Sequence, residues 1–293
     1  MNKIEKQIKT YLSGKYNTAV KIRSVLSIGG GCINSASRLE TSVGTFFLKW
    51  NNHCASDTFL REAEGLQELG KVENPFLKIP DVIFAKEVDD TPGFILLEYL
   101  LPLSAGKTGD EDLGRGLALI HQKTADKFGF YKNNYCGTTN QDNNWNSNWI
   151  DFFGQQRLWL MVSLIREEHG FDLNQINLFE KLIQKLPELI PAGSKPVLIH
   201  GDLWSGNYMF TSVGPALIDP AAYYADREME MGIMTLFGGF SQRFWNGYNE
   251  IYPLSYDWEE RNKLYRLYHI LNHYYLFGGG YGQQAILVAQ RYV

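Results

Sequence analysis

The sequence predicts an α+β protein of two lobes. A small N-terminal lobe with an antiparallel sheet is expected over residues 1–100, and a larger, mostly helical C-terminal lobe over residues 101–293. Two observations support this division. Strand-like runs rich in β-branched and aromatic residues concentrate in the first hundred residues. After Glu98-Tyr99-Leu100 the apolar residues recur with the longer period of helices.

The elements are expected in a definite order along the chain. The first lobe should hold helices over 2–13 and 58–70. Its strands are expected at 24–28, 79–88 and 94–100, together with two strand-like runs that join near Val43-Gly44. The second lobe should hold helices over 112–130, 155–169, 176–189 and 223–240, followed by aromatic-rich helices.

Composition excludes several classes of protein. Of the 293 residues 44% are hydrophobic, which is enough for a sizeable core, and the net charge of −4 gives no sign of nucleic acid or a membrane surface as a partner. No apolar run reaches the roughly 18 residues of a membrane span, and the N-terminus lacks the apolar region of a signal peptide. Cysteines stand at 32, 54 and 136 without a CxxC pair, so reduced thiols in the cytoplasm are expected.

The segment 198–219, LIHGDLWSGNYMFTSVGPALID, carries the strongest chemical signal. It has the spacing of the protein-kinase catalytic loop, H-R-D-L-x-x-x-N, followed by an aspartate after a strand. Phosphoryl transfer needs a group that accepts the proton of the attacking hydroxyl, and cations that neutralise the triphosphate. Asp202 is predicted to be the base, and Asn207 and Asp219 are predicted to offer oxygen ligands to Mg²⁺. Taken singly, each could be an ordinary turn residue; their order and spacing favour catalysis.

A glycine-rich turn is expected to cover the phosphates of ATP. It comprises Gly29, Gly30 and Gly31, followed by Cys32 and Asn34. A dinucleotide-binding glycine loop opens a helix, whereas a kinase glycine loop joins two antiparallel strands. Strand-like runs follow here, which favours the kinase interpretation over the dinucleotide one. A plain hairpin is the alternative.

Lys49 ends the second of these runs, where a kinase places the lysine that reaches the α- and β-phosphates. A glutamate on the following helix should hold its ammonium group. Glu62 is the predicted partner and Glu64 the alternative. Backbone groups of Glu98 and Leu100, at the junction of the lobes, could bind the edge of adenine.

Some polar residues outside the catalytic loop are expected to be structural. His121 is expected to be a buried or capping residue, and Asp226 and Arg227 to be partners in a structural ion pair. The segment 131–158 interleaves amides with tryptophans. It could bind hydroxyls and sugar-like rings, or it could be a long surface loop with tryptophan anchors.

Several blocks together resemble the fructosamine/ketosamine-3-kinase family. They are GGGCIN, REAEGL, FGF…NNYCGTT…W…W…FF…RL, HGDLWSGN with the following IDPA, DREMEMGIMTLFGGF and NHYYLFGGGY. The resemblance implies a protein-kinase-like fold and ATP-dependent phosphorylation of O3 of a ketosamine, whose unstable product then releases the amine. It also implies the roles given above for Asp202, Asn207 and Asp219, and for Lys49 with Glu62.

Alternatives remain for the acceptor and for regulation. A kinase of an aminoglycoside or of choline shares HGD-x₄-N, and a nucleotide-binding pseudokinase is a third possibility. Pro220-Ala221 replaces the Phe-Gly of protein kinases, so a site that is formed without switching is expected. Cys32 is predicted to be open to reversible oxidation, including a redox-linked homodimer.

Overall fold

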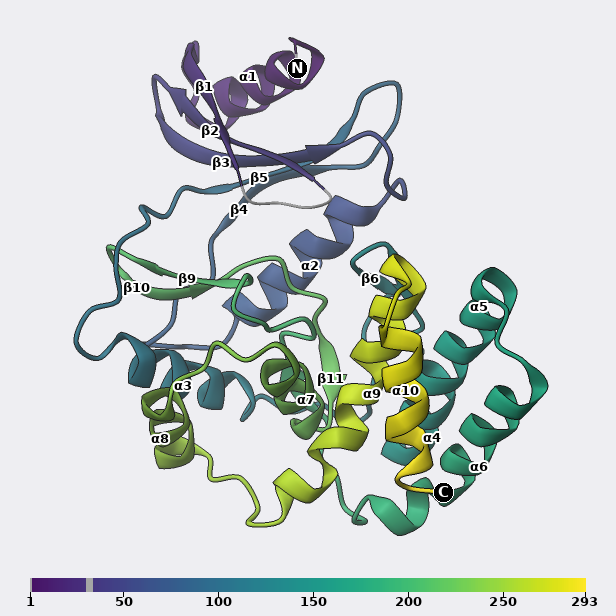
Figure 1. Ribbon diagram of the computed structural model, residues 1–293. Helices are drawn as coiled ribbons and strands as arrows, with labels where there is room; N and C mark the ends of the chain where they lie inside the picture. Colours follow the sequence, from purple (N-terminus) through teal and green to yellow (C-terminus); the bar gives the residue numbers. More distant parts are fainter. Residues whose placement is uncertain (1, 30–33) are drawn as a thin grey trace.

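The computed structural model describes residues 2–29 and 34–293. Its N-terminal part is built on one antiparallel sheet with the strand order β1-β2-β3-β5-β4. The strands are β1 (Ile22–Ile28), β2 (Ser35–Thr41), β3 (Gly44–Asn51), β4 (Val82–Lys86) and β5 (Gly93–Glu98). Helices α1 (Asn2–Tyr16) and α2 (Thr58–Gly70) cover opposite faces of this sheet (Figure 1).

Side chains alternate between the two faces of the sheet along β3 and β5, and each face forms its own hydrophobic cluster with one helix. On one face, Leu48 and Leu96 pack with Ile4, Ile8 and Leu12 of α1. On the other face, residues of β5 and α2 pack together in a second hydrophobic cluster: Ile95, Leu97, Phe59, Ala63 and Leu66. Complete burial of such a side chain stabilises the fold by about 1.5–3 kcal/mol. Lys49 follows Leu48, so the period of two turns it toward the α2 side of the sheet.

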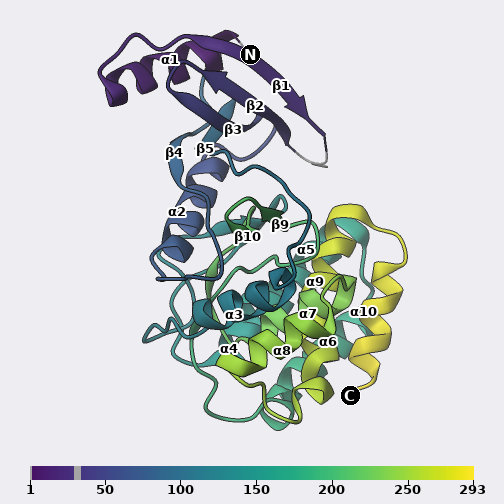
Figure 2. The same cartoon turned by 90° about the vertical axis from the view of Figure 1, so that its left-hand side faces the viewer.

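The C-terminal part is mostly helical (Figures 1 and 2). Its helices are α3 (Gly109–Ile120), α4 (Trp149–Phe153), the π-helical turn η1 (Gly154–Trp159), α5 (Leu160–His169), α6 (Leu173–Leu189), α7 (Glu228–Phe237), α8 (Gln242–Ile251), α9 (Trp258–Phe277) and α10 (Tyr281–Gln290). Three two-stranded ladders join β6 (Asn134–Cys136) with β7 (Thr139–Gln141), β8 (Val197–Ile199) with β11 (Tyr223–Ala225), and β9 (Tyr208–Thr211) with β10 (Gly214–Leu217).

Two strips of backbone connect the sheet to this helical part. Lys78, before β4, hydrogen-bonds to Pro215 and Leu217 of β10. After β5, Leu103 donates to the carbonyl of Phe210 in β9. The β9–β10 ladder is therefore one structure against which the sheet-containing part rests. Its end at the Tyr208–Leu217 pair adjoins the predicted site residues Asn207 and Asp219.

The two-lobed, kinase-like architecture predicted from the sequence is confirmed, with corrections to individual elements. The prediction of a helix over 112–130 is wrong after Ile120, where α3 ends. Beyond it, Leu198 donates to the carbonyl of Lys123, and Gly129 exchanges hydrogen bonds with Tyr224, so pairing with other strands replaces the helix.

The boundaries of other helices also differ from those predicted. The helix expected from residue 155 begins at Trp149, because Asn148 caps it by accepting from the amides of Ile150 and Asp151. In the range 223–240, where one helix was expected, Tyr223–Ala225 form β11 and the helix α7 runs from Glu228 to Phe237.

Candidate active site

The predicted catalytic loop follows β8 and turns at Gly201. Its φ is +83°, and a Cβ added there would lie 2.2 Å from the backbone oxygen of Ala221. A side chain at this position is therefore excluded by both backbone conformation and space. The amide of Ala221 donates to the carbonyl of His200 at 2.9 Å. The glycine in HGD thus allows close contact between the segments that carry Asp202 and Asp219.

His200 fixes the two ends of the loop and does not face a reactant. Its Nε2 lies 2.8 Å from the carbonyl oxygen of Ile218, and its Nδ1 accepts from the amide of Asp202 at 3.3 Å. Burial lowers the pKa of His200. A neutral ring with its proton on Nε2 satisfies both contacts.

Glu230, which the sequence analysis did not identify, anchors the loop from α7. Its carboxylate accepts hydrogen bonds from the amides of His200 at 2.5 Å and Gly201 at 3.1 Å, and the residue is 1% exposed. His121 lies behind it, with Nε2 3.7 Å from the carboxylate and Nδ1 2.8 Å from the hydroxyl of Tyr248. The prediction that His121 is buried is confirmed. An acidic residue in the first turn of a helix has an ordinary explanation in the helix dipole, so the pattern gave no reason to select Glu230.

Asp202 lies half-buried at the end of this loop. The Nδ2 group of Asn207 donates to its backbone oxygen at 2.7 Å and to Oδ2 at 3.1 Å. Burial, and then the charge of Glu230, raise the pKa of Asp202 to about 8. A carboxylate whose pKa is near neutral can both accept a proton and release it. The role of Asp202 as the base remains a prediction.

Asn207 and Asp219 present oxygens on neighbouring segments, because the amide of Ile218 donates to the carbonyl of Asn207 at 3.0 Å. Since Nδ2 of Asn207 is directed at Asp202, its Oδ1 is the atom that can bind a cation. Asp219 has a φ of +55°, a strained conformation for a residue other than glycine, and its side chain is 41% exposed. An amide oxygen and an accessible carboxylate match the hard ligands that Mg²⁺ prefers.

Lys49 joins the sheet to this site. Its Nζ lies 2.9 Å from Glu62 of α2 and 3.0 Å from Asp219. Burial opposes the positive charge, but the carboxylates of Asp219 and Glu62 together raise the pKa of Lys49. Glu64 instead pairs with Arg61. The predicted choice of Glu62 over Glu64 as the partner of Lys49 is therefore confirmed, while its contribution to nucleotide binding remains a prediction.

Helix α2 also packs directly on the segment after Asp219. A Cβ on Gly65 would lie 3.4 Å from side-chain atoms of both Pro220 and Ala222. Farther along the helix, Glu68 accepts from the hydroxyl of Tyr224 at 2.8 Å. These contacts hold the segment in the conformation seen here, and a site formed without a switching step remains a prediction.

The glycine loop can be compared with its prediction only at its edges. Three of its predicted residues lie outside the described residues, namely Gly30, Gly31 and Cys32. Gly29 follows the first strand, which ends at Ile28, and Asn34, which precedes the second strand, accepts a hydrogen bond from Asn51 at 3.0 Å. Nucleotide contacts in this loop and a homodimer through Cys32 remain predictions.

At the junction of the lobes, Glu98 has structural contacts. Its carboxylate lies 2.9 Å from Nζ of Lys78, and its amide donates to the carbonyl of Asp81. Leu100, two residues on, is buried. Adenine binding by the backbone of Glu98 and Leu100 remains a prediction.

The amide-rich segment 131–158 forms a support beside the catalytic loop. Asn134 donates to the carbonyl of Ala222, and Gln141 and Asn143 donate to its Oδ1. All three amides are at least 97% buried. Arg157, fully buried, donates to Asn143. These amides therefore serve the fold, although Trp145 and Tyr131 of the same segment are exposed.

Asp226 and Arg227 are structural, but through separate partners. Asp226 accepts from the amide of Glu228 and from the hydroxyl of Ser194. Arg227 stacks 3.7 Å from the ring centre of Tyr252 and donates to its carbonyl.

Comparison with known proteins decides the family. The sequence model of the family named fructosamine kinase matches residues 4–293. The chain belongs to the fructosamine kinase family. The family explains why a kinase catalytic loop occurs in this two-lobed fold, and identifies the protein as a phosphotransferase that acts on a sugar hydroxyl.

Relatives across the family agree in sequence and structure. The chain is 37% identical over 279 residues to a chloroplastic protein-ribulosamine 3-kinase of Arabidopsis thaliana, covering 94% of this chain and 84% of that one. It is 36% identical over 293 residues to a probable ketoamine kinase of Vibrio parahaemolyticus, covering 99% and 98%. A crystal structure from Haemophilus somnus that carries a provisional fructosamine-3-kinase name has a TM-score of 0.86 at 26% identity, covering 98% and 96%.

The fold extends to other small-molecule kinases. Aminoglycoside phosphotransferase APH(4)-Ia, solved with AMP-PNP and hygromycin B, has a TM-score of 0.61 at 12% identity, covering 97% of this chain and 98% of that one. This likeness concerns the fold alone. Among the described residues, none of the helices is both long and apolar enough to cross a membrane.

Proposed function

We propose that this fructosamine kinase family member is an ATP-dependent ketosamine 3-kinase. It would phosphorylate O3 of the sugar on glycated amines, with ribulosamines and erythrulosamines ahead of fructosamines, and so promote deglycation. The observation that carries the proposal is the convergence of Asp202, Asn207, Asp219 and Lys49 through direct hydrogen bonds and ion pairs. The name of the Arabidopsis relative favours ribulosamines as the substrate class.

In the proposed reaction, Asp202 accepts the proton of the O3 hydroxyl as this oxygen attacks the γ-phosphorus of ATP. The bond to the β-phosphate oxygen breaks, and ADP leaves. Lys49, held by Glu62, positions the α- and β-phosphates. Asn207 and Asp219 would hold Mg²⁺, which when bound would neutralise charge on the triphosphate.

The test is an ATP-consumption panel with fructosyl-, ribulosyl- and erythrulosyl-lysine as acceptors, and kanamycin and choline as controls. We expect ADP formation with at least one ketosamine, and a product phosphorylated at O3 by ³¹P and proton NMR. Turnover of kanamycin or choline alone would overturn the proposed acceptor class. ATP binding without turnover of any acceptor would favour a nucleotide-binding role.

A further inference from the structure

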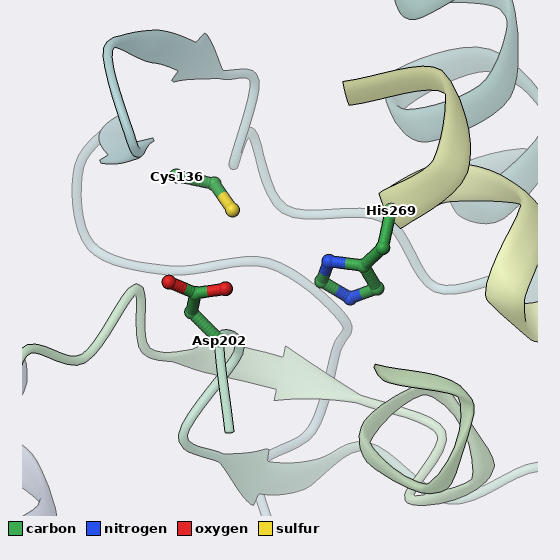
Figure 3. A group of neighbouring side chains, drawn as sticks. All are labelled: Cys136, Asp202 and His269. Atoms are coloured by element: carbon green, nitrogen blue, oxygen red, sulfur yellow. The ribbon is translucent and has the colours of Figure 1, made fainter. Parts of the chain in front are cut away.

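Three side chains with metal-binding atoms meet at the catalytic loop (Figure 3). Cys136 ends β6, Asp202 lies on the loop after β8, and His269 comes from the middle of α9. One potential ligand atom from each lies within 4.8 Å of the other two. Cys136 and His269 are 2% and 1% exposed, so Asp202, which is half-buried, is the member nearest to solvent.

His269 provides an independent indication of a ligand. Its Nδ1 is buried and has no hydrogen-bond partner among the described residues. In Figure 3 the imidazole ring lies on the side facing Cys136 and Asp202. Burial lowers the pKa of His269 well below its usual range, so the ring is neutral and keeps a free lone pair. A buried polar atom without a partner costs free energy, and in native structures it usually has a water or an ion as partner.

Cys136 is held in place beside the carboxylate. Nδ2 of Asn272, three residues after His269 on α9, lies 3.3 Å from both its Sγ and its carbonyl oxygen. Burial raises the pKa of Cys136, and the charge of Asp202 raises it further, whereas Arg157 lowers it. The thiol is therefore protonated before a cation binds.

We propose that Cys136, Asp202 and His269 form an inhibitory site for a soft divalent cation of the Zn²⁺ type. A thiolate, an imidazole nitrogen and a carboxylate are a typical donor set for Zn²⁺, whereas Mg²⁺ prefers oxygen ligands alone. Metal–ligand bonds of about 2.0–2.3 Å place tetrahedral ligand atoms about 3.3–3.8 Å apart. The ligand atoms, which lie within 4.8 Å of one another, would have to approach by up to about 1.5 Å to bind one cation.

Binding involves no redox change. The cation replaces the proton of the Cys136 thiol and, where the carboxyl of Asp202 is protonated, the proton of Asp202 as well; both are released to solvent. It accepts lone pairs from the Asp202 carboxylate and from neutral His269. Water completes the fourth position. Of the other titratable groups that act on this cluster, Arg157 and protonated His273 oppose a cation, while Glu230 and Asp219 favour it.

Inhibition rests on the proposed role of Asp202 as the base. A carboxylate that is bound to Zn²⁺ cannot accept the proton of the acceptor hydroxyl, so phosphoryl transfer would stop until a chelator removes the ion. Cation binding itself does not depend on that role, and a spectroscopic measurement tests it separately.

The binding experiment uses the full chain without nucleotide, titrated with Co²⁺ and then displaced by Zn²⁺. Wild type should show a thiolate-to-Co²⁺ charge-transfer band in the near ultraviolet and tetrahedral d–d bands. Zn²⁺ should abolish both. Cys136→Ser should lack the charge-transfer band, and His269→Gln should bind Zn²⁺ at least about tenfold more weakly in competition with a chromophoric chelator. Thermal unfolding of each variant establishes that it is folded.

Matched controls remove the same residue types elsewhere. They are Cys54→Ser at a half-buried thiol, Cys32→Ser, and His53→Gln at an exposed position, and all three should keep the Co²⁺ spectrum. Each variant's sensitivity to Zn²⁺ is then measured relative to its own zinc-free rate at saturating Mg·ATP. The inhibition constant should rise at least about tenfold in Cys136→Ser.

Two results would overturn the proposal. One is a wild-type Co²⁺ complex without thiolate charge transfer, and the other is equal Zn²⁺ affinity in wild type and folded Cys136→Ser. Loss of the band in Cys136→Ser without any zinc inhibition of wild type would uphold the cation site and count against Asp202 as the base.

Discussion

The carboxylate of Glu230 accepts a hydrogen bond from the backbone amide of His200 at 2.5 Å, and thereby ties α7 to the catalytic loop. Because the contact is to backbone, it positions Asp202 without touching a reactant. Two adjacent amides of a buried turn share this acceptor. The position of the proposed base thus depends on a residue in a helix that follows the whole β8–β11 segment.

Replacement of Glu230 by glutamine should therefore slow catalysis and weaken the fold. The amide retains one acceptor oxygen but loses the charge, which leaves a buried amide poorly satisfied at a cost of about 1–3 kcal/mol. We expect kcat to fall more than tenfold while the KM for ATP changes little. Steady-state kinetics and denaturant unfolding measure the two effects.

Glu228→Gln is the matched control for this variant. Glu228 lies two residues before Glu230 on α7 and pairs with Arg261, away from the loop. The Glu228→Gln variant should lose stability without a comparable loss of kcat. Equal kcat values for Glu230→Gln and Glu228→Gln would remove Glu230 from its positioning role.

Asp202→Asn should abolish transfer and leave ATP binding largely intact. The amide keeps the shape of the side chain but cannot accept the hydroxyl proton, and loss of a general base typically costs about 10²–10⁴-fold. Single-turnover kinetics with a ketosamine acceptor and equilibrium binding of ATP separate the two properties. Activity within about tenfold of wild type would exclude Asp202 as the base.

Glu62 and Glu64 offer a direct comparison on one helix. Glu62→Gln should raise the KM for ATP several-fold, because Lys49 loses a buried carboxylate 2.9 Å away and is held by Asp219 alone. Glu64→Gln, whose partner is Arg61, should have little effect. If the two variants had the same KM for ATP, the Lys49–Glu62 pair would have no part in nucleotide binding.

Asp219→Ala should alter the dependence of the rate on Mg²⁺, since it removes a charged oxygen ligand. Rates measured over a titration of Mg²⁺ at fixed ATP should require a higher concentration for half-saturation than wild type does. An unchanged Mg²⁺ dependence would exclude Asp219 as a ligand.

The sequence predicted correctly what is encoded locally, namely the strand before Asp219 and, from the order of strand and helix, the Lys49–Glu62 pair. The roles assigned from the contiguous spacing of His200 to Asn207 remain predictions. Groups that form only by tertiary contact were missed. Cys136 and His269 meet Asp202 from β6 and α9, which no local periodicity relates.

The amide-rich segment shows the same limit. Its composition suited either a surface for sugar-like rings or a long loop with tryptophan anchors, and it did not indicate that Asn134 and Gln141 are buried and hydrogen-bonded to each other. Likewise, residues after Ile120 have a helical pattern but pair with β8 and β11. Burial and strand pairing are set by partners distant in sequence, so local propensity could not determine either outcome.

The last prediction concerns His121 and the pH dependence of stability. Burial lowers the pKa of His121, although Glu230 and Asp226 act in the opposite direction and Arg227 adds to the lowering. The hydroxyl of Tyr248 faces Nδ1. In the unfolded chain the group titrates near its ordinary value of about 6.5. Below that pH the unfolded state binds a proton that the folded state does not, so the free energy of unfolding falls as pH falls.

His121→Asn isolates this contribution, since its amide can approach Tyr248 as Nδ1 does but does not titrate. Between pH 7 and pH 5.5 the loss of stability should be shallower in His121→Asn than in wild type, by at most about 1.4 kcal/mol per pH unit for one proton. Denaturant unfolding at several pH values measures the slopes. His53→Gln, at an exposed position, is the matched control and should retain the wild-type slope because His121 is intact. Identical slopes for wild type and His121→Asn would show that the pKa of His121 does not differ between the folded and unfolded states.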